Sequence, residues 1–258
     1  MSSLQSRTQA LLNLSLVVPV FNEEETIFLF LDRIKQTFGD VLGIKLECVF
    51  INDGSADKTL ECLLSAQQSN SSVRIVDLSR NFGKEAALTA GLEMATGQVV
   101  VPIDVDLQDP PELILAMVAK WREGYDVVLG RRANRDGDSL FKRITATLFY
   151  RIHNRSADSK IPESVGDFRL MDRAVVNALN ELPESRRFMK GLFAWVGFRT
   201  TCINYTRPER AAGATKFNGW KLWNFALEGM TSFSTAPLRI WTYLGALVAS
   251  IALLFATF

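Results

Sequence analysis

The stretch VPIDVDLQDPPE (residues 101–112) joins a predicted buried strand to a predicted helix through several acids. The apolar run 99–103 is typical of a buried strand in a parallel sheet, and it ends at Asp104 and Asp106. Since side chains alternate along an extended chain, these two carboxylates project on the same side. Asp109, followed by two prolines, is a candidate N-cap for the next helix. A helix cap accounts for Asp109 but leaves the other two acids unexplained.

The first half of the sequence repeats this strand-to-helix pattern. Runs of branched apolar residues alternate with segments whose apolar residues recur at helical spacing. Strands are predicted at 15–21, 47–51, 73–78, 99–103 and 125–130. Four helices are predicted. The first begins at residue 22, the second begins at 57, the third follows the loop 79–84 and ends at 95, and the fourth spans 111–123. This alternation predicts an α/β fold with right-handed crossovers and a mostly parallel sheet covered by helices on both faces.

Polar loops follow each predicted strand, and in a parallel sheet they meet at one edge, where ligands of open α/β sheets bind. These loops are 19–23, 52–54, 80–84, 104–108 and 130–132. Their acids, amides and cations suit a metal-bound, phosphorylated ligand. The sequence has no G-x-G-x-x-G after the first strand and no G-x-x-x-x-G-K-[ST]. These absences disfavour a dehydrogenase and a P-loop phosphotransferase.

Composition sets outer bounds on the fold and its partners. The 258 residues are 48% hydrophobic, which allows one sizeable α/β domain with an appendage. The balance of 29 basic and 28 acidic side chains argues against a nucleic-acid partner. Three cysteines without metal-ligand spacing are predicted to be buried free thiols in a reducing compartment. Residues 1–12 are short, polar and mixed, unlike a signal peptide.

The C-terminal part of the sequence has the pattern of a membrane attachment. Residues 240–258 run 19 positions without a charge, long enough to span a bilayer, with Trp241 and Tyr243 as interfacial aromatics. Segment 217–233 places tryptophans and other apolar residues at helical spacing, which predicts an amphipathic helix on the bilayer surface. The alternative is two ordinary core helices. The preceding cations, Lys216, Lys221 and Arg239, would keep the preceding domain in the cytoplasm.

At this point the sequence resembles a known family. The blocks VVPVFNEEE, INDGSADKT, LSRNFGKEAALTAG and DVDLQDPPE look like a family 2 glycosyltransferase with the nucleotide-sugar-binding GT-A fold. The likeness continues through VGDFRLMDR (165–173), RRFMKGLFAWVGF (186–198) and ERAAGATKFNGWKLW (209–223). These later blocks are similar to polyprenyl-phosphate glycosyltransferases, above all the bacterial bactoprenol (undecaprenyl-phosphate) glucosyltransferases of O-antigen modification. The resemblance covers the chain from Leu14 onward.

The resemblance implies a site for the sugar donor. Its residues would be Pro19, Phe21, Glu23, Asp53, Asp104, Val105 and Arg132. Many relatives have a tyrosine where Phe21 stands, so stacking remains but a hydroxyl contact is lost. Asp104, Asp106 and Gln108 would hold Mg²⁺ or Mn²⁺ against the diphosphate, with Asp106 the more direct ligand and a catalytic residue. An Asx-turn is the alternative role for Asp53.

The same resemblance implies an acceptor site in the second half. Asp167 stands where the family has its general base. A lipid monophosphate with a second pKa of about 6 is largely a dianion at neutral pH, so Asp167 would then orient the acceptor instead of taking a proton. The structural alternative is an ion pair with Arg169 or Arg173.

Cations for the phosphate groups are the next expectation. They would be Arg131, Arg210 and Lys216, beside the Arg132 already named, with Arg80 and Lys84 as weaker candidates. His153 has no clustered partners and is interpreted as structural.

Taken together, the residues and the resemblance imply a metal-dependent inverting glycosyltransferase at the bacterial inner membrane. It would move glucose from UDP-glucose onto undecaprenyl phosphate at the cytoplasmic face. The expected organisation is a catalytic domain at 1–210, a loop and amphipathic helix at 211–236, and a transmembrane helix at 237–258. The second span and basic tail of relatives do not follow it. Homo-oligomerisation is possible from the resemblance.

Two classes of alternative stay open. The same architecture serves dolichyl-phosphate mannose and undecaprenyl-phosphate aminoarabinose transferases, and the motifs do not identify the sugar. A processive polysaccharide synthase is disfavoured, because its Q-x-x-R-W segment is missing. A catalytically silent module that binds nucleotide sugar or lipid phosphate is the alternative from a different class.

Overall fold

The computed structural model describes residues 7, 11–133, 165–184, 187, 189–206 and 236–257. The chain divides into two compact units, one of residues Met1–Asp136 with Ser164–Thr215, the other of Gly137–Glu163 with Lys216–Phe258. The strands of the first unit are β1 (Leu12–Val20), β2 (Ile44–Asn52), β3 (Val73–Asp77), β4 (Val99–Pro102), β5 (Val127–Arg132), β6 (Val165–Asp172) and β7 (Thr200–Tyr205). Its helices are α2 (Ile27–Phe38), α3 (Thr59–Ser69), α4 (Lys84–Met94), α5 (Leu113–Arg122), α7 (Arg173–Asn180) and α8 (Met189–Trp195).

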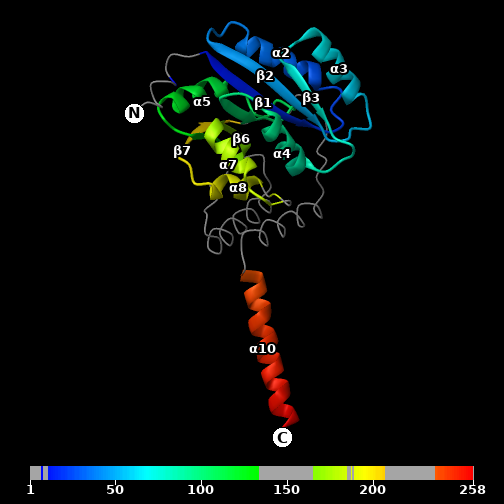
Figure 1. The fold of residues 1–258 in the computed structure, drawn as a ribbon, viewed down its shortest axis with the longest axis vertical. Helices are drawn as coiled ribbons and strands as arrows, with labels where there is room; N and C mark the ends of the chain where they lie inside the picture. Colours follow the sequence, from blue (N-terminus) through cyan, green and yellow to red (C-terminus); the bar gives the residue numbers. More distant parts are fainter. Residues whose placement is uncertain are drawn as a thin grey trace. The chain divides into compact units, whose positions relative to one another are not determined.

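The described strands form one sheet with the order β3-β2-β1-β4-β6-β5-β7 (Figure 1). β1 pairs in parallel with β2 and β4, and β2 with β3, as the strand–helix alternation predicts. Among the described strands only β6 is antiparallel to its neighbours, β4 and β5. The prediction of an α/β fold with a mostly parallel sheet is therefore confirmed. The strands β6 and β7 were not predicted from the sequence.

Successive residues of a strand point to opposite faces of the sheet, so these buried strands have an apolar side chain on each face. Helices cover both of these faces. Alternate residues of β1 from Leu12 to Val20 belong to one core cluster with the apolar faces of α2, α3 and α5. On the other face, α4 packs against β1 and β2 (Figure 1). A Cβ at Gly91 of α4 would lie 2.4 Å from Val17 and 2.6 Å from Ile51, so the glycine permits this close approach.

Several predicted helix starts are wrong by a few residues. α2 begins at Ile27 with Thr26 as its N-cap, not at residue 22, and α3 begins at Thr59, not at residue 57. α5 begins at Leu113 and its N-cap residue is Glu112, so Asp109 is not the cap. The Asp109 carboxylate instead accepts a hydrogen bond from the hydroxyl of Tyr205 on β7. Tyr205 is 96 residues from Asp109, so the local sequence around Asp109 could not predict this hydrogen bond.

The three cysteines are free, as predicted, but only Cys48 is buried, whereas Cys202 is exposed. In the second unit the structure describes helix α10 (Ala236–Ala256). A membrane span needs about 20 consecutive, predominantly apolar residues. No helix in the described part of the chain meets the length and hydrophobicity required to cross a membrane, so the transmembrane helix predicted at 237–258 is not supported. The predicted amphipathic helix at 217–233 lies outside the described residues.

Candidate active site

The reversed direction of β6 brings the two predicted halves of the site together. Asp104 and Asp106 follow the carboxyl end of β4, whereas Asp167 is the third residue of β6. Because β4 and β6 pair antiparallel, with Val99 opposite Asp172 and Val100 opposite Met171, the same register carries residue 104 level with residue 167. Acids about 60 residues apart in sequence therefore meet at one edge of the sheet.

Lys84 joins these two acids. Its ammonium nitrogen lies 2.6 Å from Asp104 Oδ1 and 3.0 Å from Asp167 Oδ2. Lys84 is the first residue of α4, and its side chain is 37% exposed, against 33% for Asp104 and 18% for Asp167. From the sequence, Lys84 was only a weak candidate for phosphate binding. In the structure it is the residue that links the predicted metal ligand to the predicted acceptor-side acid.

The carboxyl group of Asp167 is held in its ionised form. Burial alone disfavours the charged form, but Lys84, Lys190 and Arg169 together hold the pKa of Asp167 well below its usual range. Conversely, partial burial opposes the charge of Lys84, but Asp167 and Asp104 raise its pKa above the usual value. A carboxylate with so low a pKa is a weak base, which bears directly on its role.

The structural alternative for Asp167 was an ion pair with Arg169 or Arg173, and the charge of Arg169 does help to lower the pKa of Asp167. Among the described residues, the salt bridge of Asp167 is with Lys84. The Arg169 guanidinium binds backbone carbonyl groups, donating to Gly166 O at 2.7 Å and Asp167 O at 3.3 Å, and stacks on Phe193 at 3.9 Å. Burial lowers the pKa of Arg169 to about 10. The Arg173 guanidinium donates to the carbonyl group of Gly97.

The predicted metal ligands lie on a tight turn after β4. Asp106 is 8% exposed, and its Oδ1 accepts a hydrogen bond from the backbone N–H of Gln108 at 3.2 Å. Leu107 between them has a φ of 58°, a left-handed conformation that costs a bulky residue about 1–3 kcal/mol and is typical of functional sites. Asp106 therefore lies on a strained turn that follows the same strand as Asp104.

The chemistry of this donor set fits a hard divalent cation, because carboxylate and amide oxygens are the ligands that Mg²⁺ and Mn²⁺ prefer. The described residues contain no group of three or more His, Cys, Asp or Glu side chains that could hold a metal. Asp104, Asp106 and Gln108 would therefore supply part of a coordination shell, and oxygens of a bound phosphate ligand and water the remainder.

Asp53 has a structural task that the sequence did not reveal. Its two carboxylate oxygens accept hydrogen bonds from the backbone N–H groups of Phe82 and Gly83, at 2.7 and 2.9 Å. Gly54, with a φ of +65°, lies so close to this loop that a Cβ would be 2.4 Å from the carbonyl carbon of Arg80. The segment 52–54 thereby fixes the loop that leads into Lys84.

The turn predicted as an alternative at Asp53 is made by its neighbour. The side chain of Asn52 accepts a hydrogen bond from the backbone N–H of Ser55 at 3.3 Å. Asp53 itself is 4% exposed. Its oxygens can each accept a second hydrogen bond, so the contacts to the loop leave the predicted role in binding the sugar donor open.

The other predicted donor-binding residues lie around the same edge. Pro19 is near the end of β1, and Phe21 and Glu23 follow it. This loop is tied to the Asp53 loop by the Asn22 backbone N–H, which donates to Ser55 Oγ at 2.9 Å. Val105 is 4% exposed and belongs to the core cluster, so its side chain packs inward and only its backbone is available to a ligand.

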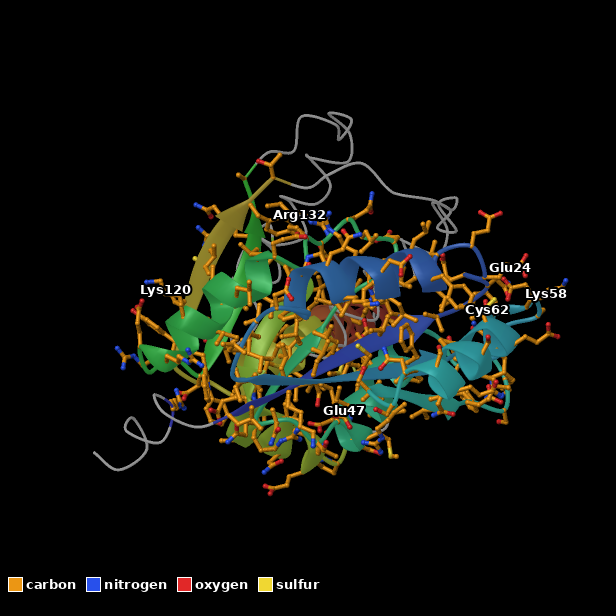
Figure 2. The ribbon with its side chains drawn as sticks, turned by 90° about the horizontal axis from the view of Figure 1, so that it is seen from above. Glu24, Glu47, Lys58, Cys62, Lys120 and Arg132 are labelled. Carbon is orange, nitrogen blue, oxygen red and sulfur yellow. The ribbon has the colours of Figure 1, made fainter. Side chains whose placement is uncertain are left out.

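Arg132, labelled in Figure 2, lies at the end of β5. It interacts with Tyr205 and Asp109. Burial opposes the charge of Arg132, but a hydrogen bond with Tyr205 and the charges of Asp109 and Asp104 raise its pKa above the usual value. Burial and the Asp109 charge raise the pKa of Tyr205 to about 12. A Cβ at Gly166 would lie 3.3 Å from Arg132 Nη2, so the guanidinium group lies over Gly166. This glycine directly precedes Asp167 in the sequence.

Two of the predicted phosphate-binding cations, Arg210 and Lys216, lie outside the described residues. Arg131 is exposed at the end of β5. The sequence did not single out Tyr205, although the β-branched and aromatic residues within 200–205 (TTCINY) are typical of a strand.

Comparison with known proteins connects this geometry to a family. Residues 15–179 match the family described as glycosyl transferase family 2. A bactoprenol glucosyl transferase of Shigella phage SfX is 52% identical over 244 residues, which is 95% of this chain and 80% of that protein. An uncharacterized glycosyltransferase of Synechocystis is 52% identical over 247 residues, or 96% of this chain and 77% of the relative.

Solved structures share the fold at lower identity. Glucosyl-3-phosphoglycerate synthase from Mycobacterium tuberculosis, in complex with Mn²⁺, UDP and glucosyl-3-phosphoglycerate, superposes with a TM-score of 0.59 at 21% identity. The match covers 87% of this chain and 79% of the synthase. A mannosyltransferase from Pyrobaculum calidifontis, in complex with GDP-mannose and Mn²⁺, has a TM-score of 0.53 at 19% identity, covering 94% and 81% of the two chains.

Proposed function

Because the chain belongs to glycosyl transferase family 2, we propose that it transfers glucose from UDP-glucose onto a polyprenyl phosphate of the bactoprenol type. Relatives named bactoprenol glucosyl transferase, 52% identical over 95% of the chain, support this substrate pair. The single observation that carries the proposal is the bridge formed by Lys84 between Asp104 and Asp167. It joins a carboxylate suited to the sugar donor with one suited to the acceptor.

The reaction is a single displacement with inversion at the anomeric carbon. A phosphate oxygen of the acceptor forms the new bond to that carbon, while the bond to the departing nucleotide diphosphate breaks. The acceptor phosphate, with a second pKa of about 6, is already a dianion near neutral pH and needs no base. Asp167, whose pKa is far below neutral, orients the acceptor and the Lys84 ammonium group and does not take a proton.

Charge on the leaving diphosphate must be neutralised as the bond breaks. Asp104 and Asp106, with Gln108, are the residues that would hold Mg²⁺ or Mn²⁺, which when bound supplies that neutralisation. Arg132, fixed by Tyr205, is the side chain of this chain suited to the same developing charge. The acceptor is a lipid, so we place the reaction at a membrane surface.

The test is transfer of radiolabelled sugar into undecaprenyl phosphate, using a panel of UDP- and GDP-sugars with and without EDTA. We expect chloroform-soluble label from UDP-glucose, and its loss with EDTA. An Asp106→Ala variant should lose about 10²–10³-fold in kcat, because stabilisation of the leaving group is removed. Label from another sugar donor would overturn the glucose assignment. Binding of UDP without transfer from any donor would favour a non-catalytic binding module.

A further inference from the structure

Lys84 contacts carboxylates from both halves of the candidate site. Its ammonium nitrogen is 2.6 Å from Asp104 and 3.0 Å from Asp167. Asp104 is one of the residues suited to hold a divalent cation, and Asp167 is the predicted acceptor-side acid. A single positive charge therefore already occupies one oxygen of a carboxylate that a metal ion would use.

The position of this charge is fixed by the fold. Lys84 begins α4, directly after the loop whose backbone is bound by the Asp53 carboxylate and packed against Gly54. The backbone of Lys84 is therefore anchored. Its side chain remains 37% exposed and ends in a compact charge on a flexible four-carbon stem, so the ammonium group can change partners while the backbone stays in place.

Building on the function proposed above, we propose that Lys84 is a displaceable counter-ion: it neutralises Asp104 while the metal site is empty and is released when a divalent cation and the donor diphosphate bind. Like charges a few ångströms apart repel, so the ammonium group and a divalent ion cannot share Asp104 without cost. After its release, Lys84 keeps Asp167 as its carboxylate partner and turns its N–H donors toward the phosphate group of the acceptor.

A displaceable counter-ion and a purely structural residue predict different effects on metal affinity and turnover. Removal of the Lys84 charge takes away a competitor of the metal, so metal affinity rises. The same removal takes away a donor to the acceptor phosphate, so turnover falls. A residue that only maintains the shape of the site would, on removal, weaken metal binding and turnover together.

The experiment measures Mn²⁺ binding directly, by electron paramagnetic resonance of free Mn²⁺ in the presence of saturating UDP and without acceptor. Lys84→Met keeps the aliphatic stem and removes the charge. We expect it to bind Mn²⁺ roughly 1.5- to fivefold more tightly than the wild type, the range for a partly exposed ion pair. In the transfer assay the same variant should raise the KM for the acceptor and lower kcat.

Two matched variants control for charge and for surface lysines in general. Lys84→Arg retains a competing cation, so its Mn²⁺ affinity should stay close to that of the wild type. Lys120→Met removes a lysine of α5 that pairs with Glu123, just after this helix, and lies apart from Arg132 (Figure 2). This variant should change neither quantity. If Lys84→Met does not fold, the double variant Lys84→Met/Asp167→Asn serves instead, since it also removes the carboxylate left without its counter-ion.

Equal or weaker Mn²⁺ binding by the folded charge-removing variant would overturn the displacement. Wild-type protein that transfers sugar but binds no Mn²⁺ with UDP would also overturn it, while leaving the transferase function intact. Tighter Mn²⁺ binding by the variant, with no sugar transfer by the wild type from any donor, would sustain the displacement and refute the proposed function.

Discussion

Asp167 illustrates how neighbouring charges set the chemistry of a single carboxylate. Burial would keep this group protonated, but Lys84, Lys190 and Arg169 reverse that effect and hold its pKa below the usual range. The family position suggests a general base, yet a carboxylate this acidic gains little by accepting a proton. The acceptor phosphate, with a second pKa of about 6, does titrate in the working pH range.

The pH dependence of transfer follows from this difference. As the pH falls below about 6, the acceptor dianion takes up a proton and becomes a weaker nucleophile, so kcat/KM should fall. Asp167 stays ionised through this range, because its folded-state pKa is depressed. Asp167→Asn should therefore lower kcat on the order of tenfold but leave the acid limb of the profile in place. Loss of that limb in the variant would instead identify Asp167 as the base.

At the level of elements, the site depends on how loops and strands are held against each other. The loop 80–83 is fixed by the turn after β2, and Lys84 gains its position from that contact. β7 supplies Tyr205, which reaches the turn after β4 through Asp109. Gly54 and Tyr205, at which these two contacts can be changed, are not among the predicted donor-binding residues, so each contact can be tested by stability as well as by activity.

Gly54 and Gly43 offer a matched pair for the first contact. Both have positive φ, but a Cβ at Gly54 would lie 2.4 Å from Arg80, whereas at Gly43 it would meet nothing within 4 Å. Gly43→Ala should cost only backbone strain, about 1 kcal/mol, and leave kcat unchanged. Gly54→Ala should cost about 2–4 kcal/mol and also lower kcat, because the loop before Lys84 must move. Urea denaturation and the transfer assay measure the two effects; equal behaviour of the two variants would contradict the loop contact.

Tyr205→Phe tests the second contact. The change leaves the buried Asp109 without the donated hydrogen bond and removes a partner of Arg132. We expect a loss of about 1–3 kcal/mol in the free energy of unfolding and a higher KM for the nucleotide sugar. Tyr243→Phe, at a position that is 73% exposed, should change stability by less than about 0.5 kcal/mol. A loss of stability without any change in KM would separate Arg132 from donor binding.

On the scale of the whole catalytic unit, the sheet and its two helical layers concentrate charged groups at one edge of an apolar core. Glu85 on α4 is one consequence. Its carboxylate accepts a hydrogen bond from the backbone N–H of Met189 at 2.8 Å, and burial together with the charge of Asp167 raises its pKa to about 7. Lys190 and Lys84 oppose this shift but do not cancel it.

The stability of the fold should therefore depend on pH through Glu85. Its folded-state pKa of about 7 exceeds the value of 4.5 expected when unfolded, so the folded protein binds more protons between these values. The stability contributed is fully present below about pH 4.5 and is lost as the pH rises through 7. Glu85→Gln should be more stable than the wild type at pH 8 by about 1–3 kcal/mol, with little difference near pH 4. Urea melts at both values test this, and an equal difference at the two would contradict it.

The sequence by itself determined the elements whose patterns are local. β1 to β5 alternate with α2 to α5 where apolar spacing predicts them, and Asp104 and Asp106 follow β4, because period and strand ends are properties of neighbouring residues. The tertiary structure alone decided the reversed direction of β6, the contact of Tyr205 with Asp109, and the bridge from Asp104 through Lys84 to Asp167. These contacts depend on strand order and on the register between distant segments, and neither produces a periodic pattern in the sequence.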